Sequence, residues 1–171
     1  TDVRKYFDSI DHERLFVIMR SKLKDERLLK LIEAITLNGG EDGKGLPIGN
    51  LTSQFFANCY LDIFDHIIKD ESAEKYYIRY MDDMLFLSSD KGHLKDLRAF
   101  VAYTLQEKLK LSLKEKATFI NRCEYGIPFL GVRVFPNQIR IKKENLKRSR
   151  RHIALREKQF EKGIITEKQL Q

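Results

Sequence analysis

The sequence predicts an α+β fold of the ferredoxin-like (split βαβ) type, in which an antiparallel-rich sheet carries helices on one face. Short runs rich in Val, Ile, Tyr and Phe alternate with long amphipathic segments. The expected order is strand, helices, strand hairpin, helix and strands, which is closest to the βαββαβ order of the split βαβ unit. The chain has 171 residues, 42% of them hydrophobic, which is enough for one domain with a core.

The first forty residues predict a strand and two helices. Residues 1–7 form the expected strand. Ser9 or Asp11 is the expected N-cap of the first helix, and the second helix runs from about Asp25 to Leu37, before an Asn-Gly-Gly stop. The apolar face of the first helix consists of Leu15, Phe16 and Met19.

A glycine-rich loop precedes the clearest helical pattern in the sequence. Residues 39–50, "GGEDGKGLPIGN", contain five of the nine glycines, which indicates a loop with unusual backbone conformations. An amphipathic helix of about seventeen residues follows, with a wide apolar stripe. Its two apolar rows are Phe55, Cys59, Ile63 and Ile67, and beside them Phe56, Tyr60, Phe64 and Ile68.

The stretch from Tyr76 to Leu87 is the expected central hairpin. Nine of its twelve residues are apolar or aromatic, yet Asp82 and Asp83 stand side by side in its middle. In one continuous strand these carboxylates would point to opposite faces, whereas a turn brings both toward a common site. We therefore predict a strand, a turn and a second strand.

The rest of the chain predicts a helix, short strands and a final basic helix. The Ser-Ser-Asp run at 88–90 caps the helix. Residues 109–113 and 116–120 are expected short strands, and 127–143 predict a hairpin that turns at Pro136-Asn137. The core row of the capped helix is Leu94, Leu97, Val101, Leu105 and Leu109.

Three carboxylates are expected where strands end or turn. Asp2 belongs to the first strand, which neighbours the central hairpin in a split βαβ sheet. Asp2, Asp82 and Asp83 would repel one another unless cations neutralised them, and Mg²⁺ favours oxygen ligands. Two such ions about 3.5–4 Å apart stabilise both oxygens of an in-line displacement. The alternative is that these are turn or cap residues, but the apolar flanks favour a site for phosphoryl or nucleotidyl transfer.

The segment "GLPIGNLTSQ" places a glycine turn directly before the amphipathic helix. Free backbone N–H groups and the positive end of the helix dipole favour a phosphate or nucleotide there. Gly49 permits close approach of the backbone to a ligand, and Asn50, Thr52 or Ser53 is an expected cap. An ordinary loop and N-cap is the alternative. The spacing is not that of a P-loop.

The formal net charge is +7 and is unevenly distributed. From Lys142 to Lys162 there are nine Lys or Arg residues and three Glu, which suits a polyanion such as nucleic acid, although a solvated helix has the same composition. Cys59 and Cys123 have no metal-type spacing and indicate reduced thiols and a cytoplasmic protein. The four scattered histidines predict no ligand set. The start without Met, in an expected strand, suggests a piece of a longer protein.

Taken together, five segments resemble a reverse transcriptase over roughly residues 1–135. "DVRKYFDSIDH" resembles the first catalytic motif of the polymerase palm, "GLPIGNLTSQFFAN" the second and "RYMDD" the third. "LSLKEKATF" loosely resembles the fourth motif, and "FLGVRVF" the fifth, which grips the primer in this family. The resemblance implies a palm with part of the fingers-proximal helices over 1–141 and the start of a basic helical thumb over 142–171.

The resemblance implies a two-metal RNA-directed DNA polymerase. Asp2 and Asp82 would hold two Mg²⁺ ions, for which Mn²⁺ is a substitute. Asp83 would complete the acidic cluster, and the backbone of Val3 would lie beside the second ion. Lys114 or Lys116 would be a general acid for the leaving pyrophosphate, or either would be a solvated lysine at a strand end.

Substrate contacts are implied in the same way. Tyr6 would be the aromatic side chain that rejects a ribose 2′-hydroxyl, with Phe7 as the alternative. The expected nucleotide-binding residues are Tyr6, Phe7, Ile48, Gly49 and Gln54. Arg79 would support the catalytic hairpin. The expected nucleic-acid contacts are Arg79, Leu130, Gly131, Lys142, Lys143, Lys147 and Arg148. The implied partners are template RNA, a DNA or RNA primer, dNTPs and a basic accessory protein, with no membrane.

The second motif points to a subfamily. Group II intron and retroviral enzymes usually show Pro-Gln-Gly followed by Ser-Pro there, whereas this chain has Pro47-Ile48-Gly49 and Ser53-Gln54. That combination resembles the reverse transcriptases of diversity-generating retroelements of bacteria and phages. Because Ile48 offers no hydrogen bond to position a nucleotide, we expect low fidelity, chiefly opposite adenine. The alternatives are another bacterial reverse transcriptase lineage, or an inactive relative that binds RNA.

Overall fold

The computed structural model describes residues 1–40 and 42–170, which fall into two compact units. Unit 1 comprises Thr1–Ile120, and unit 2 begins at Asn121. The predicted glycine loop includes residue 41, which lies outside the described residues. The predicted division into 1–141 and 142–171 concerns function and stays a prediction.

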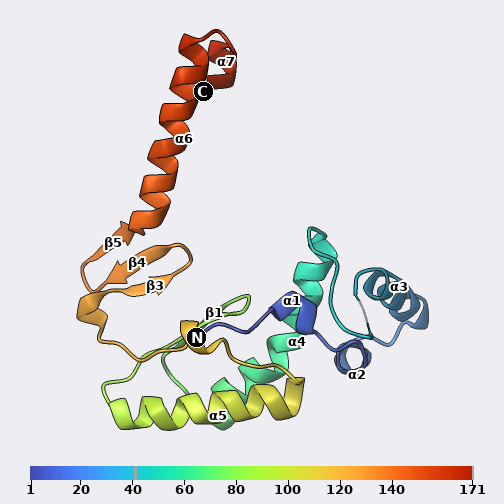
Figure 1. The fold of residues 1–171 in the computed structure, drawn as a ribbon. Helices are drawn as coiled ribbons and strands as arrows, with labels where there is room; N and C mark the ends of the chain where they lie inside the picture. Colours follow the sequence, from blue (N-terminus) through green and yellow to red (C-terminus); the bar gives the residue numbers. More distant parts are fainter. Residues whose placement is uncertain (41, 171) are drawn as a thin grey trace. The chain divides into compact units, whose positions relative to one another are not determined.

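Unit 1 contains most of the helices and the predicted central hairpin (Figure 1). A π-helical turn over Ile67–Glu71 continues its longest apolar helix, α4. Its α-helices are α1 (Tyr6–Ser9), α2 (His12–Lys22), α3 (Glu26–Leu37), α4 (Leu51–His66) and α5 (Lys91–Leu109). The hairpin consists of β1 (Tyr77–Tyr80) and β2 (Asp83–Phe86).

Aspartate caps fix where the helices begin. The carboxylate of Asp11 accepts a hydrogen bond from the Arg14 N–H at 3.0 Å, so Asp11 and not Ser9 caps α2. Asp25 caps α3 and Asp90 caps α5 in the same way. Each cap satisfies a backbone donor that the first turn of a helix leaves unpaired.

The sheet of unit 1 extends beyond the hairpin through backbone hydrogen bonds. Thr1 and Met84 exchange both N–H···O bonds, at 2.8 and 2.9 Å, which is an antiparallel pair. On its other side the first strand pairs with residues 111–114 through an antiparallel bridge between Val3 and Leu113. The order 111–114, 1–4, β2, β1 is that of a split βαβ sheet, which confirms the predicted fold class.

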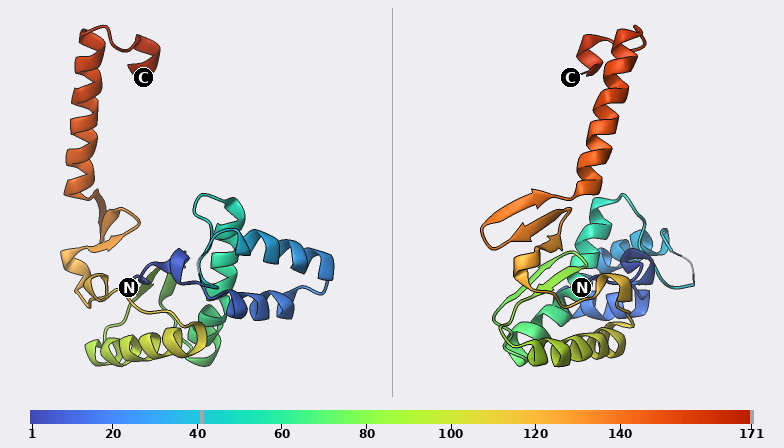
Figure 2. Two further views of the ribbon diagram at one scale, coloured as in Figure 1. Left: turned by 45° about the vertical axis from the view of Figure 1, so that its right-hand side comes forward. Right: turned by 60° about the vertical axis from the view of Figure 1, so that its left-hand side comes forward.

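The helices cover one face of this sheet. Tyr77 stacks on Phe86 across the hairpin, with ring centroids 4.8 Å apart, and meets Phe64 of α4 edge to face. Of the two rows predicted for α4, the one that consists of Phe56, Tyr60, Phe64 and Ile68 is buried. The row predicted for α5 is buried from Leu97 onward. Both views of Figure 2 show α5 on the same side of the hairpin. The opposite face carries the exposed side chains of Ile78 and Tyr80.

Three local predictions were wrong. Residues 1–7 are not one strand, because the chain enters α1 at Tyr6. Residues 116–120 do not form a strand, because a 3₁₀ turn spans Glu115–Ala117 and the Thr118 hydroxyl donates to the Lys114 carbonyl at 3.0 Å. The apolar row of α4 that consists of Phe55, Cys59, Ile63 and Ile67 is only partly covered, since Phe55 and Ile63 are exposed.

Unit 2 contains a three-stranded antiparallel sheet and a basic helix. Its elements are β3 (Ile127–Phe129), β4 (Val132–Phe135), β5 (Gln138–Ile141), α6 (Lys143–Glu161) and α7 (Glu167–Leu170). The predicted hairpin at Pro136-Asn137 is confirmed, and β3 adds a strand before it. Leu130 and Gly131 have φ values of 46° and 82°, which suits a two-residue hairpin turn. Over 1–40 and 42–170, no helix is long and apolar enough to cross a membrane.

Candidate active site

Two of the three predicted carboxylates meet at the end of the sheet. Asp2 follows Thr1, whose backbone pairs with β2, so the first strand brings Asp2 beside the hairpin turn. The carboxyl groups of Asp2 and Asp82 lie within hydrogen-bonding reach of each other. Burial raises the pKa of Asp82, and the carboxylates of Asp2 and Asp83 raise it further. This spot therefore favours a cation.

Asp83 stands slightly apart from this pair. It is the first residue of β2 and lies opposite Tyr80, so its side chain shares the open face of the hairpin with Tyr80. Among the described residues no three acidic, His or Cys side chains are close enough together to hold a metal ion. Like charges repel, and the chain by itself brings only two of these carboxylates into contact.

The donor set fits Mg²⁺ nonetheless. Mg²⁺ is usually bound through one or two carboxylates, with substrate phosphates and waters as its other ligands, so an all-protein cage is not required. Asp2 and Asp82 supply two hard oxygen donors at one point. The side chain of Val3 is buried in the core, which leaves only its backbone to face this region.

Lys114 is a cation at the same point. Its Nζ lies 3.0 Å from the Asp2 carboxylate, and its backbone N–H donates to the Asp2 carbonyl at 2.8 Å. Lys116 belongs to the 3₁₀ turn and forms no hydrogen bond or ion pair with another described residue. Of the two predicted lysines, Lys114 is therefore the one beside the carboxylates.

Arg79 holds the β1–β2 hairpin against α4. Its guanidinium forms a bidentate ion pair with Asp65, and one further N–H donates to Asn58 Oδ1 and to the Met81 carbonyl, each at 3.0 Å. The Tyr77 hydroxyl also donates to Asp65, at 2.7 Å. With a side chain only 12% exposed, Arg79 supports the turn and has little surface left for nucleic acid.

The turn that Arg79 holds is strained. Met81 has φ = 54°, a left-handed conformation that costs free energy for a residue with a side chain. Besides the bond from Arg79 to its carbonyl, its sulfur accepts a hydrogen bond from Asn58 Nδ2 at 3.2 Å. We refer to Arg79, Asp65 and Asn58 as the hairpin clamp. It places Asp82, the next residue, at the tip of the turn.

Asp65 and Asn58 were not among the predicted site residues. In the sequence they belong to the polar side of an amphipathic helix, where most residues are merely solvated. Their spacing of seven residues puts them on one face of α4, which was the available signal. The sequence does not show that this face meets Arg79.

The structure separates the two aromatic candidates at the start of α1. Tyr6 is 3% exposed, and its hydroxyl donates to the Ala57 carbonyl in the core. Phe7 is half-buried and packs edge to face on Tyr6, with ring centroids 5.7 Å apart. Of the two rings, that of Phe7 is therefore the more accessible.

The glycine turn before α4 presents its residues to solvent. Ile48 is 82% exposed, and Gln54 is exposed on α4. Gly49 has φ = 95°, a backbone conformation that L side chains rarely adopt. Asn50 occupies the N-cap position but forms no side-chain cap, so the predicted capping bond is not formed.

The expected nucleic-acid contacts of unit 2 are all on its surface. Leu130 and Gly131 form the β3–β4 turn, and Asn145 of α6 donates to the Gly131 carbonyl at 3.1 Å. No side chain described in α6 is buried. The basic residues expected to contact nucleic acid at its start are Lys142, Lys143, Lys147 and Arg148, all of them exposed or half-buried.

Comparison with known proteins identifies the family of the chain. The family model described as "Reverse transcriptase (RNA-dependent DNA polymerase)" matches residues 1–134. The chain belongs to the reverse transcriptase family. The match includes the β1–β2 hairpin and the pair of Asp2 and Asp82. Enzymes of the family are RNA-directed DNA polymerases, which are nucleotidyltransferases that use divalent metal ions.

Two curated proteins are similar to this reverse transcriptase domain. The "Uncharacterized 91 kDa protein in cob intron" of Schizosaccharomyces pombe is 36% identical over 84 residues, which is 44% of this chain and 10% of that protein. "Protein YkfC" of Escherichia coli is 24% identical over 178 residues, which is 81% of this chain and 47% of that protein. The chain thus spans a tenth and about half of the lengths of these relatives.

Proposed function

We propose that this chain is the palm of an RNA-dependent DNA polymerase that makes cDNA from a template RNA by two-metal nucleotidyl transfer. The observation that supports it best is the meeting of Asp2 and Asp82 at the sheet end, inside a reverse transcriptase match. The substrates would be template RNA, a DNA or RNA primer and dNTPs.

The proposed roles follow from the surroundings of each residue. Asp2 and Asp82 would hold Mg²⁺, with Asp83 and the backbone of Val3 beside it. When bound, the metal ions would stabilise the attacking and leaving oxygens of the displacement. Lys114 is close enough to Asp2 to hold a proton near the leaving pyrophosphate. The basic residues that open α6 would contact the nucleic-acid backbone without reading sequence.

Primer extension by the full-length protein tests this proposal. We expect extension of a DNA primer on an RNA template with Mg²⁺ and dNTPs, and its loss when EDTA removes the metal. The control is the same reaction with rNTPs only, in which extension is weak or absent. Absence of extension on RNA and DNA templates with either Mg²⁺ or Mn²⁺ would instead support an inactive RNA-binding relative.

Replacing Phe7 by Val should raise the use of rNTPs relative to dNTPs by about tenfold, because a smaller side chain leaves space for the 2′-hydroxyl. The ratio of kcat/KM values for one rNTP and its dNTP measures this. Tyr6→Phe is the matched control: it removes only the hydrogen bond to Ala57, at a cost of about 1 kcal/mol of stability, and should leave the ratio unchanged. A larger change in Tyr6→Phe would assign the gate to Tyr6.

We further propose that the enzyme is error-prone and belongs to a diversity-generating retroelement, where a basic accessory protein would be a further partner. Ile48 and Gly49 in the exposed turn, together with Gln54, support this subfamily. An intron-encoded enzyme is the second candidate, because a relative 36% identical over 84 residues is named as a protein in a cob intron. A near-duplicate pair of repeats that differ at adenines, beside the full gene, would decide for the retroelement.

Replacing Ile48 by Gln should lower misincorporation opposite template adenine by about fivefold, the effect of one added hydrogen bond on nucleotide position. Sequencing of cDNA made in vitro from one RNA template measures the error rate. Leu51→Gln is the matched control, since both side chains are 82% exposed. An unchanged error rate in Ile48→Gln, or an equal fall in Leu51→Gln, would contradict the assigned role of Ile48.

A further inference from the structure

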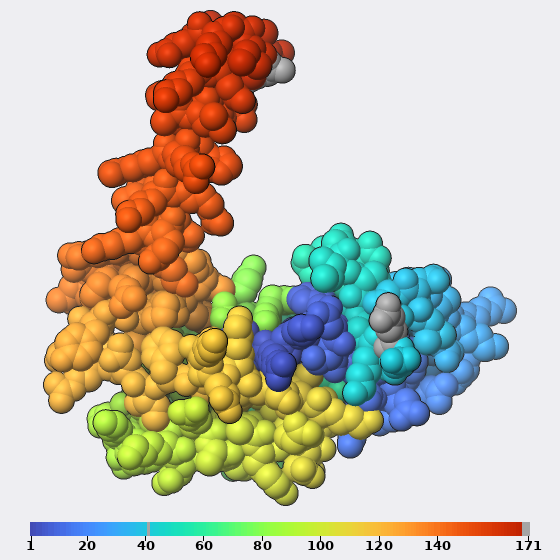
Figure 3. Space-filling model, viewed as in Figure 1, coloured from blue at the N-terminus to red at the C-terminus, as the bar shows by residue number. Residues whose placement is uncertain are grey.

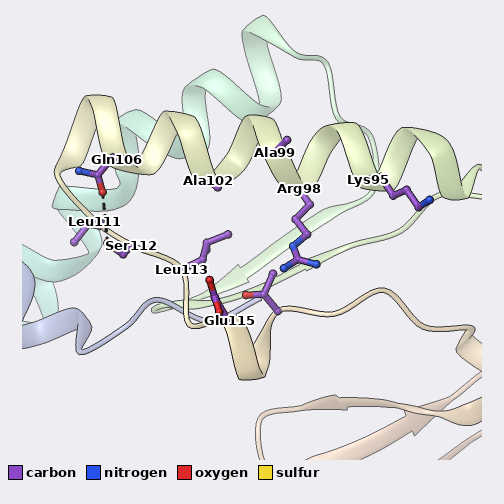
Figure 4. Close-up of a pocket in the computed structure, with 10 residues that line it drawn as sticks. Lys95, Arg98, Ala99, Ala102, Gln106, Leu111, Ser112, Leu113 and Glu115 are labelled. Atoms are coloured by element: carbon purple, nitrogen blue, oxygen red, sulfur yellow. Dashed lines mark hydrogen bonds between the residues drawn. The ribbon is translucent and has the colours of Figure 1, made fainter.

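A groove of about 410 Å³ lies in unit 1 between α5 and the chain that follows it (Figure 4). One wall is a single face of α5, with Lys95, Arg98, Ala99 and Ala102 at helical spacing. The other wall is the strand at 111–114 and the turn after it. Asp2 and Asp82 do not line this groove. Figure 3 shows α5 and the following segment side by side on the surface.

The strand in this wall is the edge of the sheet. Arg4 donates to the Ser112 carbonyl and Lys114 donates to the Asp2 carbonyl, each at 2.8 Å, on either side of the pair Val3 and Leu113. In such a pair the backbone N–H and C=O of each residue point away from the partner strand. Leu113 therefore presents both groups to the open edge, where they form no hydrogen bond with another described residue.

The helical wall of the groove carries two small side chains, Ala99 and Ala102, and two cations, Lys95 and Arg98. Ala99 and Ala102 leave space beside the edge strand, which suits an extended chain. Lys95 and Arg98 are exposed, and neither forms an ion pair within the described residues. Arg98 extends from α5 toward the turn at Glu115, the one acidic side chain among the groove residues.

We propose that this groove binds an extended, acidic segment of a partner protein, which adds a strand at Leu113. Main-chain hydrogen bonds to an exposed sheet edge give affinity, and pockets for alternate side chains give specificity. In this groove a small side chain of the partner would lie over Ala99 and Ala102. A Glu or Asp of the partner would pair with Lys95 and Arg98.

A peptide fits these features better than RNA does. A nucleic-acid strand brings one negative charge per nucleotide, whereas the groove offers two cations and one carboxylate, a balance that a peptide with a single acidic residue meets better. The open N–H and C=O of Leu113 match the regular donor and acceptor pattern of a peptide backbone, whereas the phosphate groups of RNA offer acceptors only.

The test uses the full-length protein and an array of nine-residue peptides. In each peptide one position is fixed as Glu, Gln or Lys, and the other positions carry a mixture of amino acids. We expect about tenfold more binding to peptides with Glu than with Lys at one position, the effect of ion pairs with two exposed cations. The double variant Lys95→Glu with Arg98→Glu should reverse this preference. Lys91→Glu with Lys108→Glu, on the same helix but outside the groove, should leave it unchanged.

Two further measurements separate edge pairing from general charge. Two methylated forms of the best peptide are compared, one with methyl groups on the backbone nitrogens of odd-numbered positions and one with them on even-numbered positions. One form should lose binding and the other should keep it, since only alternate N–H groups face the edge. Equal loss of binding by the two methylated peptides, or an array that shows no preference for an acidic residue, would overturn the proposal. The proposal would also be overturned if single-stranded RNA displaced the peptide and bound less tightly to the double variant Lys95→Glu with Arg98→Glu.

Discussion

Replacing Asp82 by Asn lowers the rate of primer extension by the full-length protein by about a thousandfold or more. Asp82 meets Asp2 at the tip of the hairpin, so the exchange removes one of the two carboxylates that would share a metal. Removing one preorganised charge from an active site typically costs about 10²–10³ in kcat, and metal ions add several kcal/mol of transition-state stabilisation. Single-turnover extension on an RNA template measures the loss.

The same variant should be more stable when EDTA is present. Asp82→Asn removes one of two neighbouring like charges whose repulsion the wild-type fold must bear. Mg²⁺ should raise the melting temperature of the wild type, because it binds the folded state, and should raise that of the variant much less. Asp96→Asn, on the exposed face of α5, is the control that changes neither rate nor melting temperature. Extension within tenfold of wild type would refute the assigned metal site.

Replacing Asp65 by Asn should slow extension by about tenfold to a hundredfold, although Asp65 lies outside the reacting groups. The exchange breaks the ion pair that holds Arg79, and through Arg79 the strained turn at Met81. Loss of one partner of a mostly buried pair costs about 3 kcal/mol, and a shift of about 1 Å in a catalytic group costs about a hundredfold in rate. Chemical denaturation and single-turnover kinetics measure the two effects.

A rescue experiment distinguishes positioning from general destabilisation. Glycine adopts φ = 54° without strain, so Met81→Gly should restore part of the rate lost in Asp65→Asn. Asp65→Asn should also raise the Mg²⁺ concentration needed for half-maximal rate. Asp62→Asn, whose ion pair with Lys22 is exposed on the same helix, should cost less than 1 kcal/mol and leave the rate unchanged. A loss in Asp62→Asn equal to that in Asp65→Asn would contradict the hairpin clamp.

Some features of the candidate site could be predicted from the sequence, and others could not. The hairpin at Asp82 and Asp83 was predictable, because apolar flanks and paired carboxylates have few other interpretations. The sequence could not predict which of Tyr6 and Phe7 is buried, because both are aromatic. If the strand ended one residue earlier or later, the buried and the open side chain would be exchanged. In the folded chain the Tyr6 ring is buried and its hydroxyl donates to the carbonyl of Ala57, fifty-one residues away.

The groove on α5 illustrates the same limit. The sequence predicted the buried row of α5 from its period. It also predicted a strand at 109–113, but Leu109 ends α5 and the pairing segment is 111–114. The free edge at Leu113 follows only from which side pairs with the first strand. The predicted strand at 116–120 failed because Thr118 folds back onto Lys114, a local hydrogen bond that competes with strand formation.

The sequence by itself determined the fold class, the cap of α5, the hairpin and the motifs of a reverse transcriptase, since these depend on local periodicity and on residue types at short spacing. The meeting of Asp2 with the hairpin at Asp82 was expected from the split βαβ order, whereas the tertiary structure alone decided that Lys114 pairs with Asp2 and Arg79 with Asp65. These contacts join segments brought together by strand order and helix packing, and residue spacing carries no information about such pairing. The charge balance of the site is therefore a property of the folded chain.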